Sequence, residues 1–120
     1  MPVQKILVVD DSPTERFFFT DLLNKNGYNV FTAESGEEAL VKTREIKPDL
    51  ILMDVVMPGT NGFQATREIT RDPALAHIPV IICTSKTLET DRIWGLRQGA
   101  RDYITKPINA KDLLAKIAAI

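Results

Sequence analysis

The sequence has few of the residues that form redox centres and covalent cross-links. It contains one cysteine, Cys83, and one histidine, His77, among 120 residues. A single cysteine cannot form an internal disulfide bond, and this usage is typical of a reducing compartment, so we expect a cytoplasmic protein. Cys83 falls inside an apolar run, where we expect it to pack as a small hydrophobic side chain.

Long apolar runs and blocks of like charge are also absent. No window approaches the roughly 20 apolar residues of a membrane span, and the run at residues 6–9 is too short for a signal-peptide core. Lys and Arg number 15 against 16 Asp and Glu, without a basic block, so neither a membrane nor nucleic acid is an expected partner. The length fits one domain, and we expect residues 1–120 to form a monomer with no output domain.

Short runs rich in Val and Ile recur along the chain and predict β-strands. They lie at residues 5–9, 29–33, 50–53, 80–83 and 102–105. The runs at 6–9, 50–53 and 80–83 lack polar alternation, as strands do when both faces of a parallel sheet are covered.

Helix start and stop signals lie between these strands. Capping boxes are predicted at two starts, with Ser12 and Glu15 at the first and Ser35 and Glu38 at the second. Three further starts are predicted at Asn61, Thr87 and Asn109, and three ends near Gly27, Pro48 and Gly99. The alternation predicts an α/β fold, a parallel sheet with helices on both faces and ligand chemistry at the carboxyl ends of the strands.

Carboxylates gather at these predicted strand ends. Asp10 and Asp11 follow the first strand and Asp54 follows the third. Like charges at one sheet edge repel unless a cation neutralises them, and oxygen ligands without histidine or cysteine suit Mg²⁺. Taken alone, Asp10 and Asp11 could instead favour the start of the next helix through its dipole, and Asp54 could be a solvated loop residue.

Two further strand ends supply a hydroxyl and a cation. Thr84 follows the fourth strand and Lys106 the fifth. A carboxylate such as Asp54 can act as a nucleophile toward phosphorus when a metal and a fixed cation offset the charge on the incoming group. The set therefore indicates phosphoryl transfer, although a threonine at a strand end is ordinary when considered alone.

Four motifs in this order resemble the receiver domains of two-component response regulators: VVDDS at 8–12, LMDVVMPGTNG at 52–62, IICTS at 81–85 and YITKP at 103–107. The resemblance covers essentially the whole chain. It implies a flavodoxin-like (CheY-like) three-layer sandwich with five parallel strands in the order 2-1-3-4-5 and five helices. The segments NGFQATR and ETDRIWGLRQGARDY further resemble single-domain regulators of type IV pilus chemosensory systems, which control twitching motility.

The resemblance also implies roles for individual residues: Asp54 as phospho-acceptor, Asp10, Asp11, Asp54 and the Val56 carbonyl as Mg²⁺ ligands, Thr84, Lys106 and Tyr103 as phosphoryl contacts and switch, and Pro107 in a cis peptide bond. A sensor histidine kinase would donate the phosphoryl group, and downstream motility proteins would bind the phosphorylated form. Phosphate adds charge and acceptor oxygens at one point, which a Thr84/Tyr103 switch can convert into a changed surface.

Other functions remain as alternatives. A flagellar chemotaxis regulator of the CheY type and a phosphorylation-independent interaction module are the two nearest. An aspartyl-nucleophile phosphohydrolase needs an acid two residues after its nucleophile, where this chain has Val56, so we do not expect an enzyme beyond self-phosphorylation and self-dephosphorylation.

Two aromatic residues are candidates for partner contacts. Phe17 lies about 100° around the first helix from the apolar stripe that contains Phe18, and it could be exposed or could cover the edge of that stripe. Trp94 lies on the fourth predicted helix, where packing at the core edge and partner contact are equally compatible with the sequence, whereas Ile93 and Leu96 are expected to face the sheet.

Overall fold

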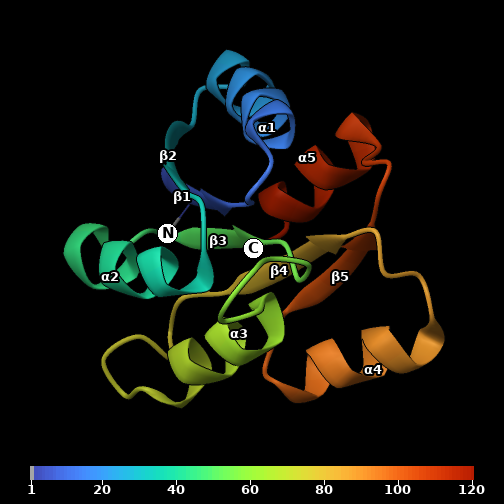
Figure 1. Ribbon diagram of the computed structural model, residues 1–120. Helices are drawn as coiled ribbons and strands as arrows, with labels where there is room; N and C mark the ends of the chain where they lie inside the picture. Colours follow the sequence, from blue (N-terminus) through green and yellow to red (C-terminus); the bar gives the residue numbers. More distant parts are fainter. Residues whose placement is uncertain (1) are drawn as a thin grey trace.

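Five parallel strands form one sheet in the order β2-β1-β3-β4-β5 in the computed structural model, which describes residues 2–120 (Figure 1). The strands are β1 (Lys5–Val9), β2 (Asn29–Ala33), β3 (Leu50–Met53), β4 (Val80–Thr84) and β5 (Asp102–Thr105). The predicted strand order is confirmed. The predicted bounds differ at one point only, where β4 continues by one residue to Thr84.

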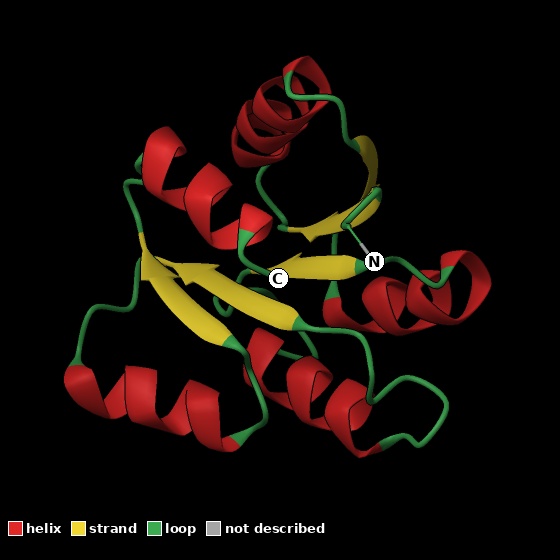
Figure 2. Cartoon of the chain, turned by 180° about the vertical axis from the view of Figure 1, so that it is seen from behind, coloured by secondary structure: helices red, strands yellow, loops and turns green. Residues whose placement is uncertain are grey.

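Five helices cover the sheet on both faces. They are α1 (Pro13–Lys25), α2 (Gly36–Ile46), α3 (Gly62–Arg71), α4 (Glu89–Arg97) and α5 (Ala110–Ala118). Helices α1 and α5 lie over one face and α2, α3 and α4 over the other, as both views show (Figures 1 and 2). The predicted three-layer sandwich is therefore confirmed. None of these helices, within the part of the chain that the structure describes, has the length and apolarity of a membrane span.

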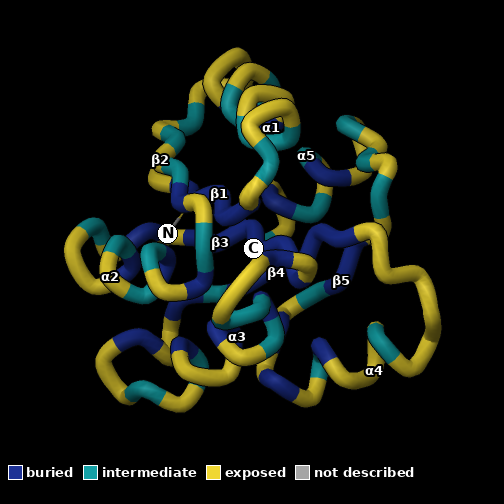
Figure 3. Tube along the Cα trace, in the orientation of Figure 1, coloured by how far each residue is buried: buried dark blue, intermediate teal, exposed yellow. Residues whose placement is uncertain are grey.

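The core has two parts because successive side chains of a strand point to opposite faces. Ile6 of β1 joins the apolar cluster that includes Phe19 of α1, whereas Leu7 joins the cluster that includes Ile69 of α3. All four of these side chains are at most 1% exposed, and the buried tube segments of the central strands are continuous in Figure 3. Each such burial contributes about 1.5–3 kcal/mol, which fixes the strands that carry the polar loops.

Helix starts agree only partly with the predicted caps. Ser12 and Ser35 each accept a hydrogen bond from the backbone N–H three residues later, at 3.3 and 3.1 Å, but neither helix has the reciprocal bond. Glu38 instead accepts a hydrogen bond from the Glu34 N–H at 3.2 Å. The full capping box forms at α3, where Asn61 and Gln64 bond each other's backbone N–H groups.

The predicted start of α4 at Thr87 is wrong. Leu88 is the N-cap residue, with an extended backbone and no side-chain cap, and the helix begins at Glu89. The preceding residues are tied to β4 and β5, because Lys86 donates its N–H to Thr84 Oγ1 at 3.4 Å and accepts a hydrogen bond from the Tyr103 hydroxyl at 2.9 Å. The chain can enter a helix only after this connection.

Candidate functional site

Three carboxylates meet at the carboxyl edge of the sheet. Strands β1 and β3 are neighbours, with Val9 opposite Met53, so the residues that follow them emerge side by side. One oxygen from each of Asp10, Asp11 and Asp54 lies within 4.8 Å of the others. Asp10 and Asp54 are buried and Asp11 is exposed, so the cluster opens to solvent on one side.

Lys106 brings a cation into this cluster from the loop after β5. Its Nζ lies 2.8 Å from Asp10 Oδ2 and 3.8 Å from Asp54 Oδ2. Glu15 of α1 is a third neighbour, with its Oε2 3.8 Å from the same Nζ. The Lys106–Pro107 peptide bond is cis.

Burial and like charge act together on Asp54. Desolvation and then the charge of Asp10 raise the pKa of Asp54 above its ordinary value, against the opposing effects of Lys106, the Val55 N–H and the Thr84 hydroxyl. Burial alone would lower the pKa of Lys106, but its hydrogen bond to Asp10 and the surrounding carboxylates raise it. Lys106 is therefore a permanent positive charge beside an acidic cluster that it neutralises incompletely.

Backbone contacts fix the position of Asp10. Its Oδ1 accepts a hydrogen bond from the Ser12 N–H at 3.0 Å, and its carbonyl accepts one from Arg16 Nη1 at 2.8 Å. The same guanidinium pairs with Glu34 at 3.1 Å, which joins the loop after β1 to the loop after β2. Sequence reasoning missed Arg16, because its role depends on how two loops approach each other.

The loop after β3 turns tightly around Asp54. Asp54 Oδ1 accepts a hydrogen bond from the Val55 N–H at 2.8 Å, and the Gly62 N–H donates to the Val55 carbonyl at 3.2 Å. A Cβ at Gly62 would lie 2.0 Å from the Asp54 carbonyl oxygen, so this close approach requires glycine. Val56 follows in the same loop with its side chain exposed.

Thr84 and Tyr103 are buried on the neighbouring strands β4 and β5. Desolvation, followed by the charges of Asp91 and Asp54, raises the pKa of Tyr103 to about 12, so its hydroxyl stays protonated and donates to the Lys86 carbonyl. The ring packs against α4 at Gly95, where a Cβ would lie 3.0 Å from the ring atom Cδ2. A direct chain of contacts thus leads from the strand that carries Thr84 to α4.

The donor set fits a hard divalent cation. All three clustered groups are carboxylates, and hard cations such as Mg²⁺ take oxygen ligands. Burial and then repulsion from Asp10 raise the pKa of Asp54, and a bound cation would relieve that repulsion. His77 and Cys83 do not belong to the cluster.

The two aromatic partner candidates lie outside the cluster. Phe17 is 72% exposed and Trp94 is 48% exposed, so neither side chain is part of the core. Ile93 is also exposed, at 41%, which makes the prediction that it faces the sheet wrong. Leu96 is partly buried against the cluster of Val55, Ile82, Ala100 and Tyr103, so the prediction is right for that residue. Gly95 and Leu96 therefore meet the sheet, and Ile93 lies about 200° around the helix from Gly95.

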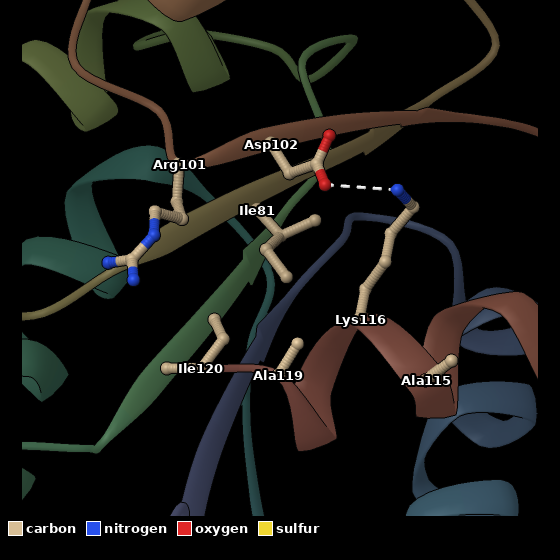
Figure 4. A pocket seen from close by; sticks show the side chains of 7 residues that line it. All are labelled: Ile81, Arg101, Asp102, Ala115, Lys116, Ala119 and Ile120. Carbon is tan, nitrogen blue, oxygen red and sulfur yellow. Dashed lines mark hydrogen bonds and ion pairs between the residues drawn. The ribbon is translucent and has the colours of Figure 1, made fainter.

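A hollow of about 350 Å³ lies at the opposite end of β5, away from Lys106. Ile81 and Ile120 provide apolar walls of the hollow. Arg101 lies on one side of it and the Asp102–Lys116 ion pair on the other, and the Arg101 side chain points away from that pair (Figure 4). Its polar groups are separated from the carboxylate cluster by the length of the strand.

A parallel α/β sandwich with an acidic cluster and a lysine at the carboxyl edge of its sheet is the architecture of a receiver domain. Residues 6–118 match the family "Response regulator receiver domain", and the chain belongs to that family. Receiver domains accept phosphoryl groups from histidine kinases and generally bind Mg²⁺ at an acidic pocket.

Among individual relatives, PilH of Pseudomonas aeruginosa is 54% identical over 116 residues, which cover 97% of this chain and 96% of PilH. The phosphate regulon transcriptional regulatory protein PhoB of the same organism is 40% identical, and the chain spans half of PhoB's length. Among solved structures, Vibrio cholerae CheY4 has a TM-score of 0.91 at 31% identity, with 98% of both chains covered. The BeF3-activated N-terminal receiver domain of Klebsiella pneumoniae RstA has a TM-score of 0.89 at 30% identity, with 95% of both chains covered.

Proposed function

We propose that this chain is a phosphorylation-switched regulator whose phospho-acceptor is Asp54. The observation that carries the proposal is the meeting of three carboxylates within 4.8 Å with Lys106 at their edge. A fixed cation at a carboxylate cluster stabilises a phosphoryl group during transfer, because the negative charge of that group must be neutralised by nearby positive charge. Family membership and the likeness to PilH support the same function.

In the proposed reaction, a carboxylate oxygen of Asp54 attacks the phosphorus of a phosphohistidine. The phosphorus–nitrogen bond of the donor breaks, an acyl phosphate forms on Asp54, and the departing imidazole takes up a proton. Asp10, Asp11, Asp54 and the Val56 carbonyl would hold Mg²⁺, which supplies charge neutralisation between the carboxylate and the incoming group. Lys106 is close enough to Asp54 to contact the phosphoryl oxygens by a small movement of its side chain.

Thr84 and Tyr103 would carry the signal to the surface. The Thr84 hydroxyl accepts a hydrogen bond from the Lys86 N–H in this structure. That hydrogen bond would break when the hydroxyl turns toward the phosphoryl group. Lys86 is also the partner of the Tyr103 hydroxyl, so its movement changes how Tyr103 packs against α4. The regulated surface would include α4, β5 and α5, with Trp94 exposed on it.

The same site is not expected to turn over substrate as an enzyme does. Val56 stands two residues after Asp54, where a phosphohydrolase would need a general acid, and its apolar side chain cannot transfer a proton. Apart from the transfer to Asp54, self-phosphorylation from small donors and self-dephosphorylation are the only reactions expected, and the output would be protein binding.

The proposed pathway is the control of type IV pili and twitching motility in the cytoplasm, with a sensor histidine kinase upstream and motility proteins downstream. Identity of 54% with PilH and the resemblance of NGFQATR and ETDRIWGLRQGARDY to pilus regulators support it. The chain would act as a monomer.

Incubation with Mg²⁺ and a small-molecule phosphodonor tests the acceptor. Wild type should gain one phosphoryl group, Asp54→Ala should gain none, and the exposed control Asp21→Asn should behave as wild type. Equal labelling of wild type and Asp54→Ala, or no labelling of either, would refute the proposed acceptor.

Phosphotransfer profiling tests the pathway. Purified histidine kinases of the pilus type and of the flagellar type are labelled and mixed with the chain for short times. Faster transfer from the pilus kinase is expected, and faster transfer from the flagellar kinase would favour the CheY-type alternative.

A further inference from the structure

The loop between β3 and α3, residues 54–61, is fixed at its two ends by backbone contacts. The Asp54 N–H donates to the Val9 carbonyl at 2.9 Å, and the Gly62 N–H donates to the Val55 carbonyl at 3.2 Å. Val56, whose carbonyl the proposed function assigns to the metal, lies just beyond the first contact and is 53% exposed. Val55 and Met57, on either side of Val56, are buried in the core, whereas Pro58 and Gly59 form an exposed tip.

Glu37, in the first turn of α2, contacts the loop next to this tip. Its Oε1 accepts a hydrogen bond from the Thr60 N–H at 2.9 Å. Within residues 2–120, this hydrogen bond is the one that joins residues 55–61 to an element not adjacent to them in the chain. The N–H and hydroxyl of Thr60 hold the pKa of Glu37 below its ordinary value, so the acceptor is a carboxylate at neutral pH.

Two glycines allow the helix and the loop to come this close. A Cβ at Gly59 would lie 2.9 Å from Glu37 Oε2, and a Cβ at Gly36 would lie 2.4 Å from the Thr60 carbonyl oxygen. Gly59 also has a φ of 74°, which favours glycine. Helices α2 and α3 lie beside each other on one face of the sheet (Figure 1), so the contact joins two elements that the sheet already holds in place.

We propose that Glu37 is a positioning residue that latches the β3–α3 loop in the conformation that presents the Val56 carbonyl to Mg²⁺. This inference rests on the proposed function and deepens it. A carbonyl ligand that is already held in place contributes fully to binding, whereas a free loop must be ordered when the ion binds, at a cost in conformational entropy. Glu37 acts through its acceptor oxygen, and its charge is not required.

Calorimetric titration with Mg²⁺ alone measures the effect. Glu37→Ala removes the acceptor and should weaken Mg²⁺ binding by up to about tenfold, which is the smallest loss expected for a direct partner of a metal ligand, because Glu37 bonds Thr60 and not Val56 itself. Glu37→Gln keeps an oxygen that can accept the Thr60 N–H and should bind within about twofold of wild type. Glu45→Ala is the matched control, because Glu45 is an exposed carboxylate on the same helix with no hydrogen bond or ion pair within residues 2–120.

Amide hydrogen exchange at Thr60 in the metal-free protein gives a second readout. Faster exchange is expected in Glu37→Ala and unchanged exchange in Glu45→Ala. Unchanged exchange in Glu37→Ala, unchanged Mg²⁺ affinity in Glu37→Ala, or a loss in Glu37→Gln as large as in Glu37→Ala would each overturn the latch. Failure of the wild type to bind Mg²⁺ would overturn the proposed function instead, and the latch as a device for metal binding with it.

Discussion

Replacement of Asp11 by asparagine should stabilise the metal-free protein and destroy its response to Mg²⁺. Asp11 is the exposed member of a cluster whose oxygens lie within 4.8 Å of one another. Lys106 lies 2.8 Å from Asp10 and 3.8 Å from Asp54, so it offsets the charge of Asp10 more than that of Asp54. Asp54 is therefore the main source of the repulsion that acts on Asp11.

The magnitude follows from Coulomb's law. Two unit charges about 5 Å apart repel by about 1 kcal/mol at the dielectric constant of water, which is appropriate because Asp11 is exposed. Loss of one charge should therefore raise the midpoint of thermal unfolding by roughly 4 °C in a chain of this size. The free energy of unfolding of wild type should rise by about 1.4 kcal/mol when Mg²⁺ is present at ten times its Kd. Wild type should then be more stable than Asp11→Asn, the reverse of the order in EDTA.

Thermal unfolding followed by circular dichroism, in EDTA and then in Mg²⁺, provides the assay. Asp21→Asn is the control, since Asp21 is an exposed carboxylate on α1 that pairs with Lys25 at 3.0 Å. It should respond to Mg²⁺ as wild type does. An Asp11→Asn variant that unfolds at a lower temperature than wild type in EDTA, or equal stabilisation of both proteins by Mg²⁺, would show that Asp11 plays no such part.

Further predictions concern Asp54, Val56 and Gly62. Because the folded pKa of Asp54 is raised, its contribution to the free energy of unfolding should rise as pH falls through that pKa, while the lowered pKa values of Asp49 and Asp102 act in the opposite direction. In pH-dependent melts of the metal-free proteins, the stability of wild type relative to Asp54→Asn should therefore rise as pH falls, and a constant difference would contradict this. Val56→Asn places a polar group beside the acceptor that can orient water, so phosphate loss followed by intact mass should be faster than in wild type, and an equal or slower rate would contradict the hypothesis. Gly62→Ala forces a Cβ against the Asp54 carbonyl, so the free energy of unfolding measured in urea should fall by about 3 kcal/mol. A fall below about 0.5 kcal/mol would mean that the loop relaxes freely around the added methyl group.

The clustering of Asp10, Asp54 and Lys106 could be predicted because it follows from topology. Each residue directly follows a strand, and the carboxyl ends of parallel strands share one edge of the sheet. The uninterrupted apolar runs also predicted the strands β1, β3 and β4 to within one residue at each end, since strands covered on both faces need no polar alternation.

The residues that support the site could not be predicted in the same way. Arg16 and Glu37 act across gaps between loops, so their partners Glu34 and Thr60 depend on loop paths that no local signal encodes. Glu15 has the right spacing for a capping box with Ser12, yet its carboxylate lies 3.8 Å from Lys106, because a half-buried cation competes with a backbone N–H as a partner.

The central claim is that Asp54 accepts a phosphoryl group in a site that needs Mg²⁺. Peptide mapping by mass spectrometry after transfer from a histidine kinase, with Mg²⁺ present or removed by EDTA, tests it most directly. One modified residue, Asp54, is expected, and only when Mg²⁺ is present. Modification at another residue, or equal modification of Asp54 in EDTA, would contradict the central claim.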